Sequence, residues 1–341
     1  MGIIEDGAFI GLDSFLNLNL SYNKIGKLSK NAFMVLKKLK ISDLSNNNLT
    51  KKESTLDKLN YLDLSGTGIE DLGTNTFDQL SLKTLRLDDN SIRIIPSNFF
   101  NFNDKLVSLS MIRNPISIIP QDSSNHKMKL TYLYLTIHGK ILEKRFFNVI
   151  FLKGLHIVHS QITELHKYSF KGLVNLKKLN FKNSTILEIE PGAFVGLRNV
   201  MESDRENLFA NVSSLKSKTF IGLDSLESFN FSKVGMGIIE DGAFIELDSL
   251  LNLNLSYNQI EKLSKNAFMV LKKLKISDLS NNNLTKKEST FPIGTFRDLV
   301  ELTDLHLQHN RIIKLHISTI RHIQTPTDVK DDWYRREQVA M

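Results

Sequence analysis

Apolar and polar positions follow one short pattern along most of the chain, LxxLxLxxNxI, where x is mostly polar. A representative copy runs from Leu82 through Leu85, Leu87 and Asn90 to Ile92. Side chains alternate between the two faces of a strand, so the LxL core predicts a short strand with one apolar face. The pattern recurs thirteen times at steps of 20 to 28 residues, with its Asn position at 23, 47, 67, 90, 114, 138, 160, 184, 208, 234, 258, 282 and 310.

A second motif, FxxL, accompanies most copies of the first. A strand of three or four residues cannot bury a core alone, so we expect successive coils to stack with their strands parallel. Each buried Leu or Ile then contributes roughly 1.5–3 kcal/mol, and the phenylalanines pack under the returning segment. The FxxL copies begin at Phe9, Phe33, Phe77, Phe170, Phe194, Phe220, Phe244, Phe268 and Phe296.

Together these motifs resemble the leucine-rich repeats of about 24 residues found in extracellular proteins, such as Toll-like receptor ectodomains and insect leucine-rich immune proteins. The resemblance implies an α/β leucine-rich repeat solenoid. Its expected form is a curved horseshoe, with a parallel β-sheet on the concave face and an irregular or short-helical convex side. The array covers residues 1–318 in about 13 repeats, with a degenerate stretch near 200–216 and a polar C-terminal tail at 319–341.

Asparagine suits its position in the template for a physical reason. A buried amide carries both donors and an acceptor, so it can bond the backbone of its own coil and of the neighbouring coil. We therefore predict a structural ladder of Asn23, Asn47, Asn90, Asn114, Asn258, Asn282 and Asn310. Thr67, His138, Ser160, Ser184, Leu208 and Val234 replace asparagine, so the ladder should be weakest in the middle.

Residues 1–55 and 236–290 are nearly the same sequence and differ only at positions 11/246, 15/250, 24/259 and 26/261. Two explanations stay open, a recent internal duplication and an error in the gene sequence. Because Met1 aligns with Met236, inside a repeat, we expect an N-terminus without a cap and an incomplete chain that lacks its signal peptide.

Composition narrows the function. The chain has no cysteine, which removes disulfides and thiolate chemistry. Its net charge of +7 is spread along the sequence, so we expect no nucleic-acid partner, and no apolar run is long enough for a membrane segment. No catalytic, cofactor or metal motif occurs, which predicts a protein that is not an enzyme and binds no cofactor or metal. The oligomeric state stays open.

The residues between the leucines should face the concave side, and in the middle repeats they become arginine, tyrosine and histidine. Arg and Tyr dominate binding hot spots, which favours a site for a protein or microbial ligand there. The alternative is that tyrosine is present simply because it favours strands. The candidate binding residues are Arg86, Arg113, Tyr132, Tyr134, His156 and His159.

Seven N-x-S/T sequons favour a secreted or cell-surface glycoprotein, since such sites are used outside the cytosol. They are Asn19, Asn48, Asn183, Asn211, Asn230, Asn254 and Asn283. The resemblance implies a receptor ectodomain, an innate immune protein or an adhesion protein. An intracellular adaptor and a truncated fragment without function are the alternatives.

Overall fold

The computed structural model describes residues 2–29, 31–49, 51–52, 59–72, 81–96, 99, 105–117, 129–141, 149–203, 214–284, 294–313 and 315. The chain forms two compact units, the first of residues 1–139 with 144–160 and the second of residues 140–143 with 161–341. The predicted tail at 319–341, Asn211 and most of the degenerate stretch lie outside the described residues.

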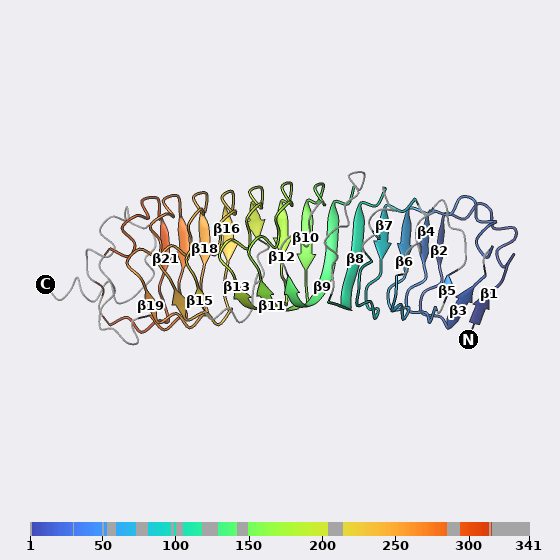
Figure 1. Cartoon of the computed structure of the whole chain (residues 1–341), viewed down its shortest axis with the longest axis horizontal. Helices are drawn as coiled ribbons and strands as arrows, with labels where there is room; N and C mark the ends of the chain where they lie inside the picture. Colours follow the sequence, from blue (N-terminus) through green and yellow to red (C-terminus); the bar gives the residue numbers. More distant parts are fainter. Residues whose placement is uncertain are drawn as a thin grey trace. The chain divides into compact units, whose positions relative to one another are not determined.

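In the described part of the first unit, seven parallel strands form the main sheet, one strand for each copy of the template (Figure 1). In order these are β2 (Asn17–Asn19), β4 (Ile41–Asp43), β6 (Tyr61–Asp63), β7 (Thr84–Arg86), β8 (Ser108–Ile116), β9 (Tyr132–Ile141) and β10 (Gly154–Ile157). The returning segments add a small parallel sheet of β1 (Gly2–Ile4), β3 (Ile25–Leu28) and β5 (Lys51–Lys52).

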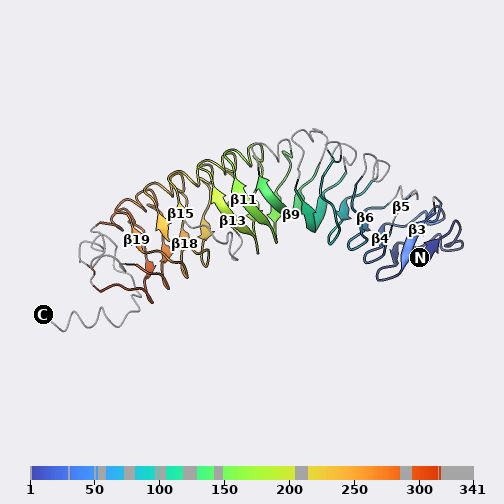
Figure 2. The same cartoon turned by 60° about the horizontal axis from the view of Figure 1, so that its bottom comes forward.

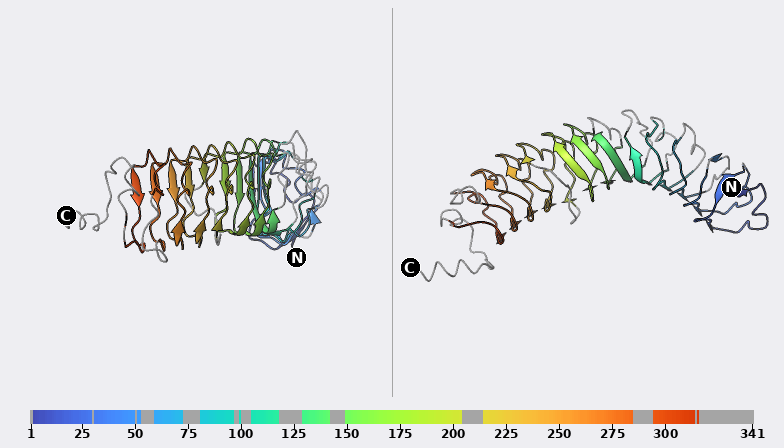
Figure 3. Two further views of the ribbon diagram at one scale, coloured as in Figure 1. Left: turned by 60° about the vertical axis from the view of Figure 1, so that its left-hand side comes forward. Right: turned by 90° about the horizontal axis from the view of Figure 1, so that it is seen from below.

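The second unit repeats this plan, and Figure 3 shows its strands as successive rungs. The main-sheet strands are β12 (Lys178–Asn180), β14 (Glu202–Ser203), β16 (Ser228–Asn230), β18 (Asn252–Asn254), β20 (Ile276–Asp278) and β21 (Asp304–His306). On the returning side, visible in Figure 2, β11 (Gln161–Leu165) pairs with β13 (Thr185–Ile189), while β15 (Ser214–Leu215), β17 (Ile238–Ile239) and β19 (Lys262–Leu263) form a further sheet.

The solenoid predicted from the pattern is therefore confirmed, and the structure decides the form of its returning side. The sequence left open an irregular or short-helical return, and the described return segments are turns and short strands without a helix. Glycines and single left-handed residues turn the chain at these corners, which suits turns better than helical geometry. Across the described residues, no helix has the length and hydropathy needed to span a membrane.

The core consists of side-chain columns that continue from coil to coil. In the second unit, Phe170, Phe194, Phe220 and Phe244 stack with ring centroids 5.8, 6.0 and 6.1 Å apart, and the stack continues through Phe268 to Phe296. These rings are at most 1% exposed. The template leucines form parallel columns beside them, so each coil completes the core of the next.

The asparagines bond as an inter-coil ladder. Asn258 donates from Nδ2 to the carbonyls of Phe231 (2.8 Å) and Leu255 (2.9 Å), and its Oδ1 accepts from the amides of Val234 (3.0 Å) and Met236 (3.2 Å). The ladder amides other than Asn23 thus satisfy backbone groups of two coils at once. Where Ser160 replaces asparagine, its hydroxyl donates to Val158 O and accepts from Ile137 N.

Two strands of the main sheet are unexpectedly long. The repeats predict strands of three or four residues, but β8 has nine residues and β9 has ten. In the copy that forms β9, His138 stands at the asparagine position, and the strand continues through it to Ile141. The missing asparagine does not account for both lengths, since β8 keeps Asn114 in the ladder and β10, with Ser160 at this position, has only four residues.

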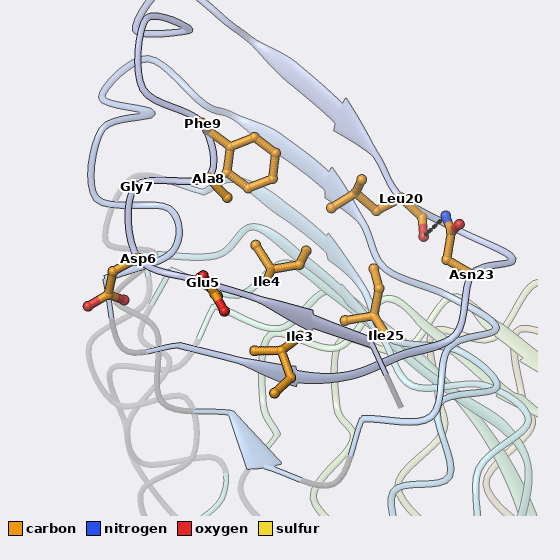
Figure 4. A pocket seen from close by; sticks show the side chains of 10 residues that line it. All are labelled: Ile3, Ile4, Glu5, Asp6, Gly7, Ala8, Phe9, Leu20, Asn23 and Ile25. Carbon is orange, nitrogen blue, oxygen red and sulfur yellow. Dashed lines mark hydrogen bonds between the residues drawn. The ribbon is translucent and has the colours of Figure 1, made fainter.

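At the first coil the same architecture is open on one side. Ile3, Ile4, Phe9, Leu20 and Ile25 line a hollow of about 580 Å³. Figure 4 shows the hydrogen bond that Asn23 donates to Leu20 O of its own coil, which is 2.9 Å long. The other lining residues are Glu5, Asp6, Gly7 and Ala8. This edge is where a further coil would stack in the interior of a solenoid.

Candidate functional site

The register of the first unit aligns the predicted binding residues in rows across adjacent strands. One row runs Asp63, Arg86, Ser110, Tyr134, His156, since each residue pairs directly with the next across β6, β7, β8, β9 and β10. The leucines between the rows face inward and are at most 2% exposed. The strand alternation therefore presents the polar and aromatic residues together on the outer side of the main sheet.

Three of the candidates form what we call the aromatic face: Tyr132, Tyr134 and His156. Tyr134 and His156 stack with ring centroids 4.4 Å apart and planes inclined by 15°. Tyr132 is 42% exposed and lies against the backbone of Gly154, where an added Cβ would stand 2.7 Å from the ring. Gly154 thus leaves room for the Tyr132 ring, which lies on the same side of the sheet as the stacked Tyr134 and His156.

Arg86 is fixed by two buried carboxylates beside the aromatic face. Its guanidinium lies 3.4 Å from Asp63 and 3.0 Å from Asp88, whose side chains are 8% and 6% exposed. Asp88 also accepts from the Ser110 hydroxyl at 2.5 Å and from Ile112 N at 2.8 Å. Each aspartate can stay buried because several donors surround it.

The electrostatics of this cluster follow from those contacts. Partial burial disfavours the charge of Arg86, but hydrogen bonds with Tyr61 and Asp88 and the charges of Asp63 and Asp88 outweigh it and raise the pKa of Arg86. Burial in the same place raises the pKa of Tyr61, whose hydroxyl donates to Asp63 at 3.1 Å. Arg86 is thus a permanently charged, immobilised group with part of its side chain exposed.

Arg113 and His159 occupy a different column, one position before the asparagine ladder. Both have left-handed backbones, with φ of 55° and 52°. Arg113 pairs with Asp89, donating from Nη2 to Oδ2 at 2.6 Å, and this hydrogen bond lowers the pKa of Asp89. Both partners are about half exposed. The structure therefore brings Arg86, Tyr132, Tyr134 and His156 onto the sheet face and places the other two candidates at its margin.

Sequence reasoning missed the role of the aspartates. Of the two adjacent aspartates, Asp88 is buried at 4% exposure, whereas Asp89 faces solvent. The signal was present in the repeat position. Asp88 follows the last strand leucine, where Ser21 and Ser45 stand in the first coils, and Asp89 is one step further toward the turn.

Stacked parallel strands, a buried asparagine ladder and a phenylalanine column define a leucine-rich repeat solenoid. The chain belongs to the leucine-rich repeat family: the profile described as "Leucine rich repeat" matches residues 3–49, 152–202, 237–284 and 252–312. A second profile, "BspA type Leucine rich repeat region (6 copies)", matches residues 54–153. This confirms the family resemblance drawn from the motifs.

The relatives include a Toll-like receptor and osteomodulin. Toll-like receptor 3 of Boselaphus tragocamelus is 26% identical over 335 residues, covering 91% of this chain and 31% of the receptor. Osteomodulin of Bos taurus is 28% identical over 169 residues, covering 48% of this chain and 39% of that protein. The chain thus spans well under half of the length of either relative.

Solved structures agree on the fold. Toll in the Toll–Spatzle complex of Drosophila superposes with a TM-score of 0.72 at 18% identity, over 95% of this chain and 47% of that chain. The TLR13–ssRNA13 complex gives 0.60 at 20% identity, over 96% and 65%. Since one of these complexes contains RNA, the expectation that this chain has no nucleic-acid partner gains no support from its relatives.

Proposed function

We propose that the protein is a non-enzymatic extracellular binding scaffold whose ligand, a protein or a microbial surface molecule, docks on the aromatic face of the first unit. The observation that carries this proposal is the row in which stacked Tyr134 and His156 share one sheet face with immobilised Arg86. Rigid aromatic rings and a fixed guanidinium lose little conformational entropy when they are covered by a partner.

Two further observations support the setting and the type of partner. The relatives include Toll-like receptor 3, and the Toll structure that resembles this chain was solved with the protein Spatzle. Asn48 and Asn183, both in sequons, are exposed, as a secreted glycoprotein requires. An intracellular adaptor would not be glycosylated at such sites, because they are used outside the cytosol.

Binding to defined probes tests the proposal. The purified full chain is passed over immobilised secreted proteins, microbial cell-wall polysaccharides and single-stranded RNA, and binding is measured by surface plasmon resonance. We expect saturable binding to a protein or polysaccharide probe, weakened about thirtyfold or more by Tyr134→Ala with Arg113→Ala, since a hot-spot truncation costs about 2 kcal/mol or more.

Two variants serve as controls. Tyr134→Phe keeps the ring and should bind nearly as the parent does, and Tyr22→Ala removes a tyrosine that is 82% exposed in the first coil of the same unit and should change nothing. Unchanged binding in the Tyr134→Ala variant with Arg113→Ala would refute the aromatic face as the site. If the RNA probe is the only one that binds, the ligand is a nucleic acid and not a protein or a microbial surface molecule.

A further inference from the structure

Two strands of the second unit bring together a histidine and two glutamates from successive coils. β11 and β13 pair in parallel with Glu164 opposite Glu188 and Leu165 opposite Ile189. His166 and Glu190 follow directly after these strands, and Glu190 N donates to Leu165 O at 2.9 Å. Since Leu165 and Ile189 are buried, alternation turns the side chains on either side of them outward to one cluster.

The ligand atoms of Glu164, His166 and Glu190 all lie within 4.8 Å of one another. His166 Nε2 is 3.3 Å from Glu164 Oε2, and its Nδ1 is 3.4 Å from Glu190 Oε2. In a tetrahedral site with metal–ligand distances of about 2.0–2.2 Å, ligand atoms stand roughly 3.3–3.6 Å apart. The two carboxylates contact opposite nitrogens of the imidazole, so a shared metal ion requires a small rotation of the ring or of the Glu190 side chain to bring both to one nitrogen.

A second observation concerns the imidazole. His166 Nε2 is buried from solvent and lies 3.3 Å from Glu164 Oε2, but it makes no hydrogen bond to that oxygen or to any other described group. A buried polar atom without a hydrogen bond is unfavourable, and a bound cation would satisfy it. By contrast, Glu190 is held in place, because its Oε2 accepts from Lys167 N at 2.7 Å.

From this geometry we propose that Glu164, His166 and Glu190 bind a divalent transition-metal ion such as Zn²⁺. Imidazole and carboxylate are ordinary zinc ligands, and a three-residue set leaves one coordination position for water. This site lies in the second unit and is independent of the proposed ligand face in the first.

The ammonium group of Lys140 competes with a metal ion for the Glu164 carboxylate. Its Nζ is 2.8 Å from Glu164 Oε2 and donates a hydrogen bond that lowers the pKa of the Glu164 carboxyl. The side chain is 56% exposed, so it can withdraw into solvent when a metal ion takes its place. Lys140 therefore keeps Glu164 ionised without blocking the position permanently.

Zinc titration of the full chain, freed of metal with a chelator, tests the proposal by isothermal titration calorimetry. We expect one saturable Zn²⁺ site, with affinity reduced at least about tenfold by His166→Ala and by Glu190→Gln, because either change removes one of three ligands. Lys140→Gln should raise the affinity severalfold. With Co²⁺ in place of Zn²⁺, visible absorption bands of a tetrahedral site should appear in the parent and vanish in His166→Ala.

His156→Ala, which removes a histidine of the first unit, is the matched control and should leave zinc binding unchanged. Glu190→Gln keeps an oxygen that can accept from Lys167 N, so circular dichroism should show an intact fold. The proposal is overturned if the parent shows no saturable site, or if His166→Ala binds zinc as the parent does.

Discussion

At the scale of single residues, the same type of side chain differs in burial and in hydrogen bonding, depending on whether a neighbouring coil covers it. Asn23 and Asn258 occupy the same place in the two nearly identical segments. Asn23 is exposed and bonds only carbonyls of its own coil, whereas Asn258 is 7% exposed and bonds two coils. The sequence shows that an asparagine occupies this position, but its contribution to stability depends on the coil beside it.

This difference gives a matched pair of variants. Asn258→Ala leaves backbone groups of two coils without partners and should lower the free energy of unfolding by about 1–3 kcal/mol. Asn23→Ala should cost well under about 1 kcal/mol, since water reaches the groups it bonds. Urea denaturation of the two variants measures the difference, and equal losses would contradict the ladder's role.

The two arginines of the candidate site form a second matched pair. Arg86→Met leaves the buried carboxylates of Asp63 and Asp88 without their cation, which should destabilise the chain by roughly 3 kcal/mol. Arg113→Met breaks an exposed pair with Asp89 and should cost at most about 1 kcal/mol. Thermal unfolding measures the loss of stability in each variant. If Arg86→Met is as stable as the parent, the buried aspartates do not depend on this cation.

At the scale of elements, the duplicated segments show what stacking adds to one sequence. Leu253 and Leu18 occupy equivalent positions in β18 and β2, and Leu253 is 1% exposed while Leu18 is only half buried. Both strands keep the same register to the next coil, Asn17 to Ile41 and Asn252 to Ile276. The segment therefore specifies its strand locally, and the preceding coil decides how deeply it is buried.

Truncating the paired leucines measures that contribution. Leu253→Ala should destabilise the chain by about 2–5 kcal/mol, and Leu18→Ala by clearly less, because less surface leaves water there on folding. Hydrogen exchange should likewise be slower in residues 252–263 than in 17–28. The peptides are distinguishable because Gln259 replaces Lys24. Similar protection in both segments would mean that something else covers the first coil.

One of the four differences between the segments fits this contrast. Glu246, which stands where the first copy has Gly11, accepts a hydrogen bond from Gly222 N of the preceding coil at 3.0 Å. The space beside Gly11 is open, with no atom within 4 Å of an added Cβ. The larger residue is present in the copy where it has a neighbouring coil to contact.

At the scale of the whole molecule, the sequons follow the repeat. Asn19 and Asn254 accept hydrogen bonds from the amides of Ser21 and Ser256 at 2.9 Å, so these asparagines also fix the turn after each strand. Asparagine at this position therefore has a structural reason apart from glycosylation. Exposure, not the sequon alone, has to distinguish the sites that carry a glycan.

The proposed extracellular setting leads to a test of that distinction. When the chain is secreted from animal cells behind a foreign signal peptide, Asn48 and Asn183 should be glycosylated, because both are exposed. Asn254, half buried and bonded to Ser256, should be occupied less. Mass spectrometry of glycosidase-treated peptides measures each site, and uniformly empty exposed sites would count against a secreted protein.

The sequence by itself determined the repeat, its family, the inward leucines and phenylalanines and the asparagine ladder, because these are local patterns repeated at a nearly constant period. It could not reveal the burial of Asp63 and Asp88, the stacking of Tyr134 on His156, or the meeting of His166 with Glu190, which lie 24 residues apart. Those contacts depend on the register between coils. Only the tertiary structure fixes that register, since it sets which side chains of neighbouring coils face one another.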